Sequence, residues 1–436
     1  MGKVSQKTVI VGAGPAGLLL AHYLLARHYP VEIYDRRPDP RTVSPDQRRS
    51  FPISLQARGR KALQGIPGLE EAIANHSVFC QGTMVHRKDK ARDIPRANKV
   101  MTIDRNQLVL MLLEQLTANY SQPALTIGFD CICDRIDDEQ QTVSFKKATG
   151  EDFSVHYERL VGADGARSQV REQLAEHYAF GYEQAYVPDA YRSIFLARKN
   201  PEQGIELAPD RIHTSNLSND CRIILAPQPG DRLHGAFIFN ANNNPLDAFS
   251  TKEEILDYFE ENLPTFRAVM SPEEAEALLQ RPTARLVTIK CDRFHHGDRI
   301  LLLGDAAHAV SPSIGQGCNS ALEDIAIIND LLDHSQKNGQ ENGQDDWSQA
   351  IAQFSQRRVA DAHALKALSD YSFPRSKWLI PEFFLRLIVG RKLHKWFPKR
   401  FNPFVFDLVL DSDLPYSEVL RLSQGWISKV ERSMST

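Results

Sequence analysis

The feature that most constrains the fold is the segment TVIVGAGPAGLLLAHYLLARHYPVEIYD, residues 8–35. It reads as an apolar strand, a glycine-rich turn, a helix and a second apolar strand. In such a unit the first glycine permits the tight turn, the second lets backbone approach a pyrophosphate, and the third lets the helix pack closely. The phosphates would lie at the helix N-terminus, where free N–H groups and the helix dipole favour negative charge. The turn residues assigned to the dinucleotide are Gly12, Gly14, Pro15, Ala16 and Gly17.

An acid closes this unit. Asp35 ends the second strand, at the place where a carboxylate accepts hydrogen bonds from the ribose hydroxyls of a dinucleotide. A carboxylate there disfavours a 2′-phosphate, so FAD and NAD both fit. We also assign Arg36, the next residue, to the cofactor site.

Two later segments repeat the pattern of an apolar strand that ends at an acid. RLVGADGARSQVR, residues 159–171, places Asp164 after its strand, either at a ligand or as the cap of the following helix. LLLGDAAHAVSPSIGQGCNSALED, residues 301–324, places Asp305 at the carboxyl end of a strand, where open α/β sheets bind ligands. Its loop has little bulk, and a helix begins near Gly317.

These three segments, in this order, resemble those of the FAD-dependent aromatic hydroxylases of the para-hydroxybenzoate hydroxylase fold. The resemblance implies an α/β protein: a Rossmann-like FAD-binding domain, an inserted mixed β-sheet substrate domain and a C-terminal helical region. It implies that Asp305 binds the ribityl chain, that Asp164 lies near the pyrophosphate and the nicotinamide route, and that Arg105 lies near the pyrophosphate. Further FAD contacts implied by the resemblance are Ser54, Cys133, Gly315, Gly317, Cys318 and Asn319.

The chain then divides as follows. Residues 1–75, 101–180 and 286–365 form the FAD-binding domain, and residues 76–100 and 181–285 form the substrate domain. Residues 366–436 form a helical lid. Within the substrate domain we predict a helix over 252–262, and within the last FAD segment we predict a polar loop over 334–349.

Within this family, the runs RRSFPISLQARGRKAL (48–63), TMVH (83–86) and LSDYS (368–372) resemble the kynurenine 3-monooxygenases. Those enzymes hold the amino-acid end of kynurenine with an arginine, which is replaced here by Thr83. Three further polar substrate contacts, a tyrosine, an asparagine and a second tyrosine, are replaced by Arg96, Ser372 and Val405, and a phenylalanine of the aromatic wall is replaced by Ser313.

A carboxylate needs paired, charge-assisted donors, and this pocket keeps only Arg96. We therefore predict a monooxygenase that acts on another aromatic or lipophilic small molecule. The alternative is a genuine kynurenine 3-monooxygenase in which Arg96 or Lys99 binds the carboxylate. Two further alternatives are a flavin-dependent epoxidase or reductase of a lipophilic substrate and a non-catalytic flavin-bound redox sensor.

The resemblance also implies the mechanism. NADPH or NADH reduces FAD, the reduced flavin takes up O2 as a C4a-hydroperoxide, and one oxygen atom passes to the substrate. A second GxGxxG sequence is absent, so the nicotinamide has no Rossmann unit of its own. No catalytic side chain is required beyond those that bind the cofactor and substrate.

Composition excludes several other classes. The 436 residues carry a formal charge of −3, which gives no reason to expect nucleic acid as a partner. The six cysteines form neither a metal-ligand pattern nor a disulfide framework, which predicts a protein without metal in a reducing compartment such as the cytoplasm. The aromatic and basic segment 378–410 is either part of the lid or a peripheral membrane contact. The oligomeric state is not indicated by the sequence.

Overall fold

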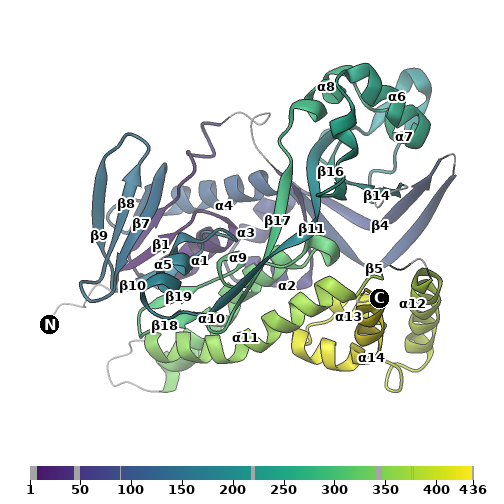
Figure 1. The fold of residues 1–436 in the computed structure, drawn as a ribbon. Helices are drawn as coiled ribbons and strands as arrows, with labels where there is room; N and C mark the ends of the chain where they lie inside the picture. The colour runs from purple at the N-terminus through teal and green to yellow at the C-terminus, as the bar shows by residue number, and fades with distance from the viewer. Residues whose placement is uncertain are drawn as a thin grey trace.

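The computed structural model describes residues 7–43, 50–88, 90–217, 221–338, 346–374, 376 and 378–434 (Figure 1). Its first part is a six-stranded sheet in the order β18-β19-β10-β1-β2-β6. Neighbouring strands from β19 to β6 are parallel, and β18 is antiparallel to β19. The strands are β1 (Thr8–Val11), β2 (Val31–Tyr34), β6 (Leu125–Gly128), β10 (Arg159–Gly162), β18 (His295–His296) and β19 (Ile300–Leu302).

This sheet is covered on both faces, which is why its strands are continuous apolar runs. Helix α1 (Pro15–Ala26) is apolar all round and almost wholly buried, and it packs against α4 (Arg105–Asn119) and α10 (Gly317–Asn338). A three-stranded antiparallel sheet of β7 (Cys131–Asp137), β8 (Thr142–Lys147) and β9 (Asp152–His156) packs against β2. There the Tyr34 ring lies 4.5 Å from the ring of Phe145. Helix α5 (Gln169–His177) follows β10 and contacts β7.

The second part is an eight-stranded mixed sheet in the order β17-β11-β16-β15-β14-β4-β5-β3. Its strands are β3 (Pro52–Leu55), β4 (Val78–Arg87), β5 (Lys90–Asp104), β11 (Tyr182–Ala197), β14 (Arg211–Asn216), β15 (Arg222–Gln228), β16 (Arg232–Asn240) and β17 (Ala284–Cys291). Strands β3, β4 and β5 of this sheet precede β10 in the sequence, and its other strands follow β10. A separate pair, β12 (Lys199–Asn200) and β13 (Ile205–Glu206), forms a short hairpin.

Three helices cover one face of the second sheet, at the top of Figure 1. They are α6 (Lys252–Asn262), α7 (Pro264–Arg267) and α8 (Pro272–Gln280). Their apolar residues, including Phe259 and Phe266, form a separate core with Phe237 and Phe239 of β16. The second sheet thus has its own apolar core, distinct from that of the first sheet.

The third part is a group of C-terminal helices along the lower right of Figure 1. They are α11 (Trp347–Tyr371), α12 (Leu379–Trp396), α13 (Val405–Asp411) and α14 (Tyr416–Met434). Their shared apolar cluster includes Leu368, Phe383, Val405 and Trp426, and it also takes in Ile314 from the loop before α10. The remaining helices are α2 (Ala57–Gln64), α3 (Leu69–Ala74), α9 (Asp305–His308) and the 3-10 turns η2 (Pro201–Gln203), η3 (Pro245–Ala248) and η4 (Pro312–Ile314).

The predicted fold class is confirmed: a Rossmann-like sheet, a second mixed sheet and a helical C-terminal region. The predicted helix over 252–262 is α6. The loop predicted over 334–349 was partly wrong, because α10 continues to Asn338 and α11 begins at Trp347; residues 339–345 lie outside the described residues. The finer division of the chain stays a proposal; β5 runs past residue 100 and β17 spans residue 285.

Candidate active site

The turn between β1 and α1 has the geometry of a phosphate cradle. Gly12 has φ +111°, and a Cβ there would lie 2.4 Å from the carbonyl oxygen of Ala163, so only glycine fits. A Cβ on Gly17 would lie 2.0 Å from the Gly12 carbonyl oxygen, which explains the close packing of α1. At Gly14 a Cβ would meet no described atom within 4 Å. The open space therefore lies at the N-terminus of α1, where an anionic pyrophosphate would bind.

Asp35 is buried beside this turn. Its Oδ2 accepts a hydrogen bond from the backbone N–H of Ala13 at 2.7 Å, and Arg37 donates to it through both backbone and guanidinium. Burial opposes ionisation of this carboxyl, but the hydrogen bonds and charge of Arg37 outweigh it and hold the pKa of Asp35 below its ordinary value. Arg36 is exposed and donates to the carbonyl oxygen of Arg167 at 3.4 Å. The sequence did not single out Arg37, although a partner two residues after an acid is a common turn contact.

Asp164 lies between the first turn of the dinucleotide unit and the start of α5. Its Oδ2 accepts hydrogen bonds from the backbone N–H groups of Gln169 at 2.7 Å and Val170 at 3.3 Å, so it caps α5. Its Oδ1 is buried and has no hydrogen-bond partner among the described residues. Burial raises the pKa of Asp164, despite these hydrogen bonds. A buried acceptor without a partner next to Gly12 is the kind of group that a bound polar ligand would satisfy.

Asp305 lies one turn beyond the carboxyl end of β19, and its carboxylate is exposed. Asp324 of α10, which is fully buried, fixes the turn that precedes Asp305. Asp324 accepts hydrogen bonds from the Gly304 backbone N–H at 2.9 Å, His308 Nε2 at 2.6 Å and Arg358 Nε at 2.7 Å. Burial opposes ionisation of Asp324, but the charges of His308 and Arg358 lower its pKa. The network fixes the turn and leaves the Asp305 carboxylate available to a ligand.

The sequence did not identify Asp324 or Arg358 as parts of the site. The only available signal was an acid on the otherwise apolar face of the helix that begins at Gly317. A charged residue at a core-facing helical position implies a buried partner, but nothing local identifies that partner as Arg358.

The loop before α10 presents backbone rather than side chains. Asn319 is wholly buried: its Oδ1 accepts from the Gln56 backbone N–H at 2.7 Å, and its Nδ2 donates to the carbonyl oxygens of Ser54 at 2.9 Å and Gly315 at 3.0 Å. These bonds tie β3 to the start of α10. The exposed Gly315 and half-buried Gly317 leave the backbone of this loop open, as the prediction of backbone contacts requires.

Three more predicted cofactor residues lie around this loop and the first turn. Burial and the nearby Asp305 raise the pKa of Cys318 to about 12, while Arg105 acts in the opposite sense, so all three are electrostatic neighbours. Arg105 is exposed at the first turn of α4. Cys133 is buried, and burial and then Asp164 raise its pKa. Cys318 thus lies close to Asp305 and Arg105, and Cys133 lies close to Asp164.

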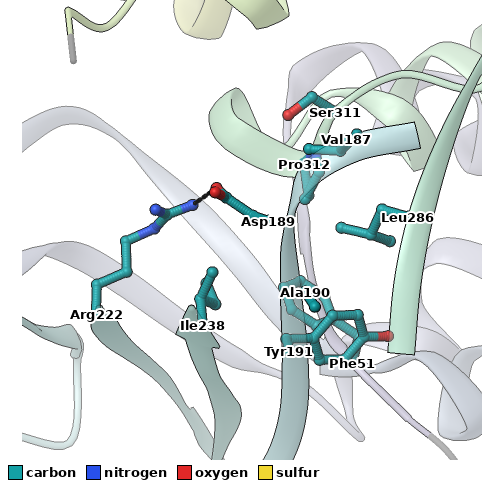
Figure 2. Close-up of a pocket in the computed structure, with 10 residues that line it drawn as sticks. All are labelled: Phe51, Val187, Asp189, Ala190, Tyr191, Arg222, Ile238, Leu286, Ser311 and Pro312. Carbon is teal, nitrogen blue, oxygen red and sulfur yellow. Dashed lines mark hydrogen bonds and ion pairs between the residues drawn. The ribbon is translucent and has the colours of Figure 1, made fainter. Parts of the chain in front are cut away.

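A small pocket opens between loop 311–316 and the second sheet (Figure 2). Its cavity is about 20 Å³, room for one water. In its wall Arg222 donates to Asp189 Oδ2 at 2.7 Å, and the ring of Phe51 meets that of Tyr191 edge-on, with ring centroids 5.4 Å apart. The lining residues are Phe51, Val187, Asp189, Ala190, Tyr191, Arg222, Ile238, Leu286, Ser311 and Pro312.

Three of the five predicted substrate residues lie around the C-terminal apolar cluster. Val405 is buried in that cluster. Ser313 Oγ donates to the carbonyl oxygen of Ser369 at the end of α11. Ser372 is wholly buried; its carbonyl oxygen accepts from Trp426 Nε1 at 2.9 Å, and its hydroxyl has no partner among the described residues.

The other two lie on the second sheet. Thr83 of β4 pairs with Ile94 of β5, and Arg96 follows two residues later. Arg96 is half-buried next to Asp411 of α13, and its guanidinium has no hydrogen bond or ion pair within the described part of the chain. Burial lowers its pKa, and Asp411 opposes this. An enclosed guanidinium with free donors is suited to an anionic or polar group.

Three other features, a metal site, a disulfide and a membrane-spanning helix, are absent from the described residues. The described residues hold no group of three or more side chains that could bind a metal ion. None of the six cysteines, all of which lie in the described ranges, forms a disulfide. In the described ranges, no helix combines the length and the apolar character needed to cross a membrane.

Comparison with known proteins now identifies the family. The model of a family described as "FAD binding domain" matches residues 5–362, and the chain belongs to that family. A curated relative is the kynurenine 3-monooxygenase of Legionella pneumophila (strain Corby), 29% identical over 426 residues that cover 95% of this chain and 90% of that protein. The kynurenine 3-monooxygenase of Sus scrofa is 28% identical and covers 97% and 87%.

Solved structures share the fold. A tetrameric form of 2-methyl-3-hydroxypyridine-5-carboxylic acid oxygenase superposes with a TM-score of 0.70 at 20% identity, covering 93% of this chain and 96% of that one. Pseudomonas PqsL in complex with 2-aminobenzoylacetate gives 0.61 at 19% identity, covering 87% and 99%. With the family match and the curated relatives, these findings make the chain an FAD-dependent monooxygenase of the aromatic hydroxylase type, with NAD(P)H as reductant.

Proposed function

We propose that this monooxygenase inserts one oxygen atom into an aromatic or lipophilic small molecule other than kynurenine. The observation that carries the proposal is the chemistry of the five substrate positions. Four of them, Thr83, Ser313, Ser372 and Val405, offer only hydroxyls or an apolar side chain. Leaving a carboxylate and an ammonium in such surroundings without paired charges costs several kcal/mol, about 2 to 4 orders of magnitude in specificity.

The residues of the chain would divide the work as follows. The start of α1 and the open face of Gly14 would hold the pyrophosphate, Asp35 the adenosine ribose and Asp305 the ribityl chain. The bound flavin supplies the redox chemistry: it accepts hydride from NAD(P)H and activates O2. The backbone of loop 311–316 would border the ring, and the C-terminal apolar cluster would exclude water from the substrate side.

A second candidate is a genuine kynurenine 3-monooxygenase. Arg96 supports it, because its guanidinium is enclosed, unpaired within the described chain and close to α13. The curated relatives support it too, since they match over almost the whole chain.

The test is NADPH oxidation by the purified yellow protein with and without L-kynurenine, with mass spectrometry of the product. We expect no stimulation by kynurenine, and stimulation with one added oxygen atom by another aromatic or lipophilic compound. Stimulated oxidation that yields hydroxykynurenine would refute the proposal. A product with two added hydrogens would indicate a reductase, and bound FAD without substrate-stimulated oxidation across a substrate panel would indicate a redox sensor.

Two variants test which side chain would bind the carboxylate of kynurenine. If kynurenine is a substrate after all, Arg96→Ala should raise its KM strongly, and Lys99→Ala, a change at an exposed neighbour, should not. An unchanged KM in Arg96→Ala would remove Arg96 from the site, and a raised KM in Lys99→Ala alone would assign the carboxylate to Lys99.

We also propose a reducing compartment such as the cytoplasm. In the described part of the chain, which includes all six cysteines, no disulfide is formed, and five of the six thiols are buried. Such thiols persist where glutathione and thioredoxin keep them reduced.

A further inference from the structure

The outer surface of α12 carries an unusual concentration of exposed apolar side chains. Of the fourteen large hydrophobic residues that are exposed in the described chain, seven lie between residues 378 and 401. Trp378 and Trp396, at the two ends of the helix, are 91% and 67% exposed. The seven are Trp378, Leu385, Ile388, Val389, Trp396, Phe397 and Phe401.

These side chains follow one side of the helix. Trp378, Leu385, Ile388, Val389 and Trp396 recur at helical spacing, so they form one stripe along α12. We call them the α12 stripe. An 18-residue helix is about 27 Å long, so the stripe is long enough to lie along a surface.

The exposure of the stripe is not explained by a loosely attached helix. The opposite side of α12 is anchored: Phe383 and Leu387 are buried in the C-terminal cluster. The Phe383 ring lies 5.5 Å from that of Phe404 and 6.0 Å from that of Trp426. Figure 1 shows α12 at the outer edge of the molecule, beside α13 and α14. The helix is therefore held with its stripe outward.

Positive charge surrounds the stripe. Segment 378–400 contains six Lys or Arg residues and one acid, Glu382. Glu382 is already bound by Arg386 and Lys429, and Arg391 is paired with Asp407. The exposed cations without an ion pair in the described chain are Lys392, Lys395, Lys399 and Arg400.

This positive charge indicates which kind of partner binds the α12 stripe. A second copy of α12 would bring two sets of cations together, which opposes association. The rest of this chain already packs on the inner side of α12. An anionic lipid surface matches both properties, because tryptophans and aliphatic side chains enter the interface while lysines and arginines meet the headgroups.

We propose that α12 binds flat on the surface of an anionic membrane, with the α12 stripe in the headgroup region. The apolar burial and the attraction of the four free cations act together, so neutral lipid alone binds weakly. This inference does not depend on which molecule the enzyme oxidises.

The test is co-sedimentation of the FAD-loaded protein with phosphatidylcholine vesicles, with and without phosphatidylglycerol. We expect binding to the anionic vesicles that salt weakens, and little binding to the neutral ones. Leu385→Ser/Ile388→Ser should lower the affinity roughly tenfold or more, and Lys392→Ala/Lys395→Ala roughly 30-fold. The matched control is Ile132→Ser, which removes another exposed apolar side chain, from β7.

Tryptophan fluorescence gives a second readout. Trp347 and Trp426 are buried, so a blue shift on vesicle binding should come from Trp378 and Trp396 and should vanish in Trp378→Phe/Trp396→Phe. The altered side chains are exposed, and unchanged flavin content would show that the variants fold.

Three results would overturn the proposal. The first is no binding to either vesicle type. The second is equal binding by the wild type and both double variants. The third is light scattering that shows a dimer which Leu385→Ser/Ile388→Ser converts to monomer, because that would assign the stripe to a second copy of the chain.

Discussion

The replacement Gly14→Ala separates cofactor binding from folding. Gly14 has φ −83°, which any residue adopts, and its added Cβ would meet no described atom within 4 Å. The apoprotein should therefore fold, with a loss of up to about 1 kcal/mol because alanine is a poorer N-cap than glycine. The methyl group would instead occupy the space that we assign to the pyrophosphate.

The expected loss of affinity follows from hydrogen-bond geometry. A phosphate oxygen sits about 2.9 Å from a donor N–H, and a methyl group at that place keeps it away. Losing one charge-assisted hydrogen bond costs about 1.5 to 3 kcal/mol, which weakens FAD binding roughly 10- to 150-fold.

The assay is flavin titration of apoprotein, followed by absorbance, with urea unfolding of the same samples. Gly12→Ala is the matched control: its Cβ would lie 2.4 Å from the Ala163 carbonyl oxygen at φ +111°, so it should lose about 2 to 5 kcal/mol of stability. Wild-type FAD affinity in Gly14→Ala would refute the placement of the pyrophosphate against this residue.

Three further predictions concern the site and its support. Asp305→Ala should lower flavin affinity with little change in unfolding free energy, because the carboxylate is exposed; an equal loss of stability would contradict this. Asp324→Asn should cost about 3 to 5 kcal/mol in urea unfolding, because Arg358 would lose a buried partner; a loss below about 1 kcal/mol would show that the network is dispensable. Burial, and then the adjacent His213, lower the pKa of His86 to about 4, whereas the unfolded chain binds its proton near 6.5. Above pH 6.5 the protonation of His86 does not affect the free energy of unfolding. As the pH falls from 6.5 toward 4, the unfolded chain binds a proton that the folded protein does not, and the free energy of unfolding falls by about 3 kcal/mol in total. His86→Gln should flatten that part of the pH–stability curve, and an unchanged slope would count against the assignment.

The sequence predicted those parts of the fold that depend on local pattern. Residues 8–35 form the expected strand, turn, helix and strand, and α10 begins at Gly317 as expected. Both depend on glycine positions and apolar periodicity, which are properties of short segments. The family resemblance supplied the FAD-binding domain and the second sheet, and the comparisons confirm them.

What the sequence did not predict depends on contacts between distant segments. Arg358 reaches Asp324 from a different helix, and no local pattern pairs them. The last turn of α10 was assigned to a loop because its residues are polar in the sequence, and a polar helix end and a polar loop can have the same composition. The roles assigned to the substrate positions, Arg96 above all, remain predictions.

The order of strands in the first sheet has a consequence for how the chain is made. In that sheet β1 pairs with β10 and β10 with β19, so Thr8 meets Arg159 and Leu160 meets Ile300. At 5–20 residues per second, a ribosome needs roughly 15 to 60 s after β1 before β19 exists. Until then β10 has an open, apolar edge, which is a template for pairing with other chains. A nascent or truncated chain that stops before residue 300 should therefore aggregate and depend on chaperones.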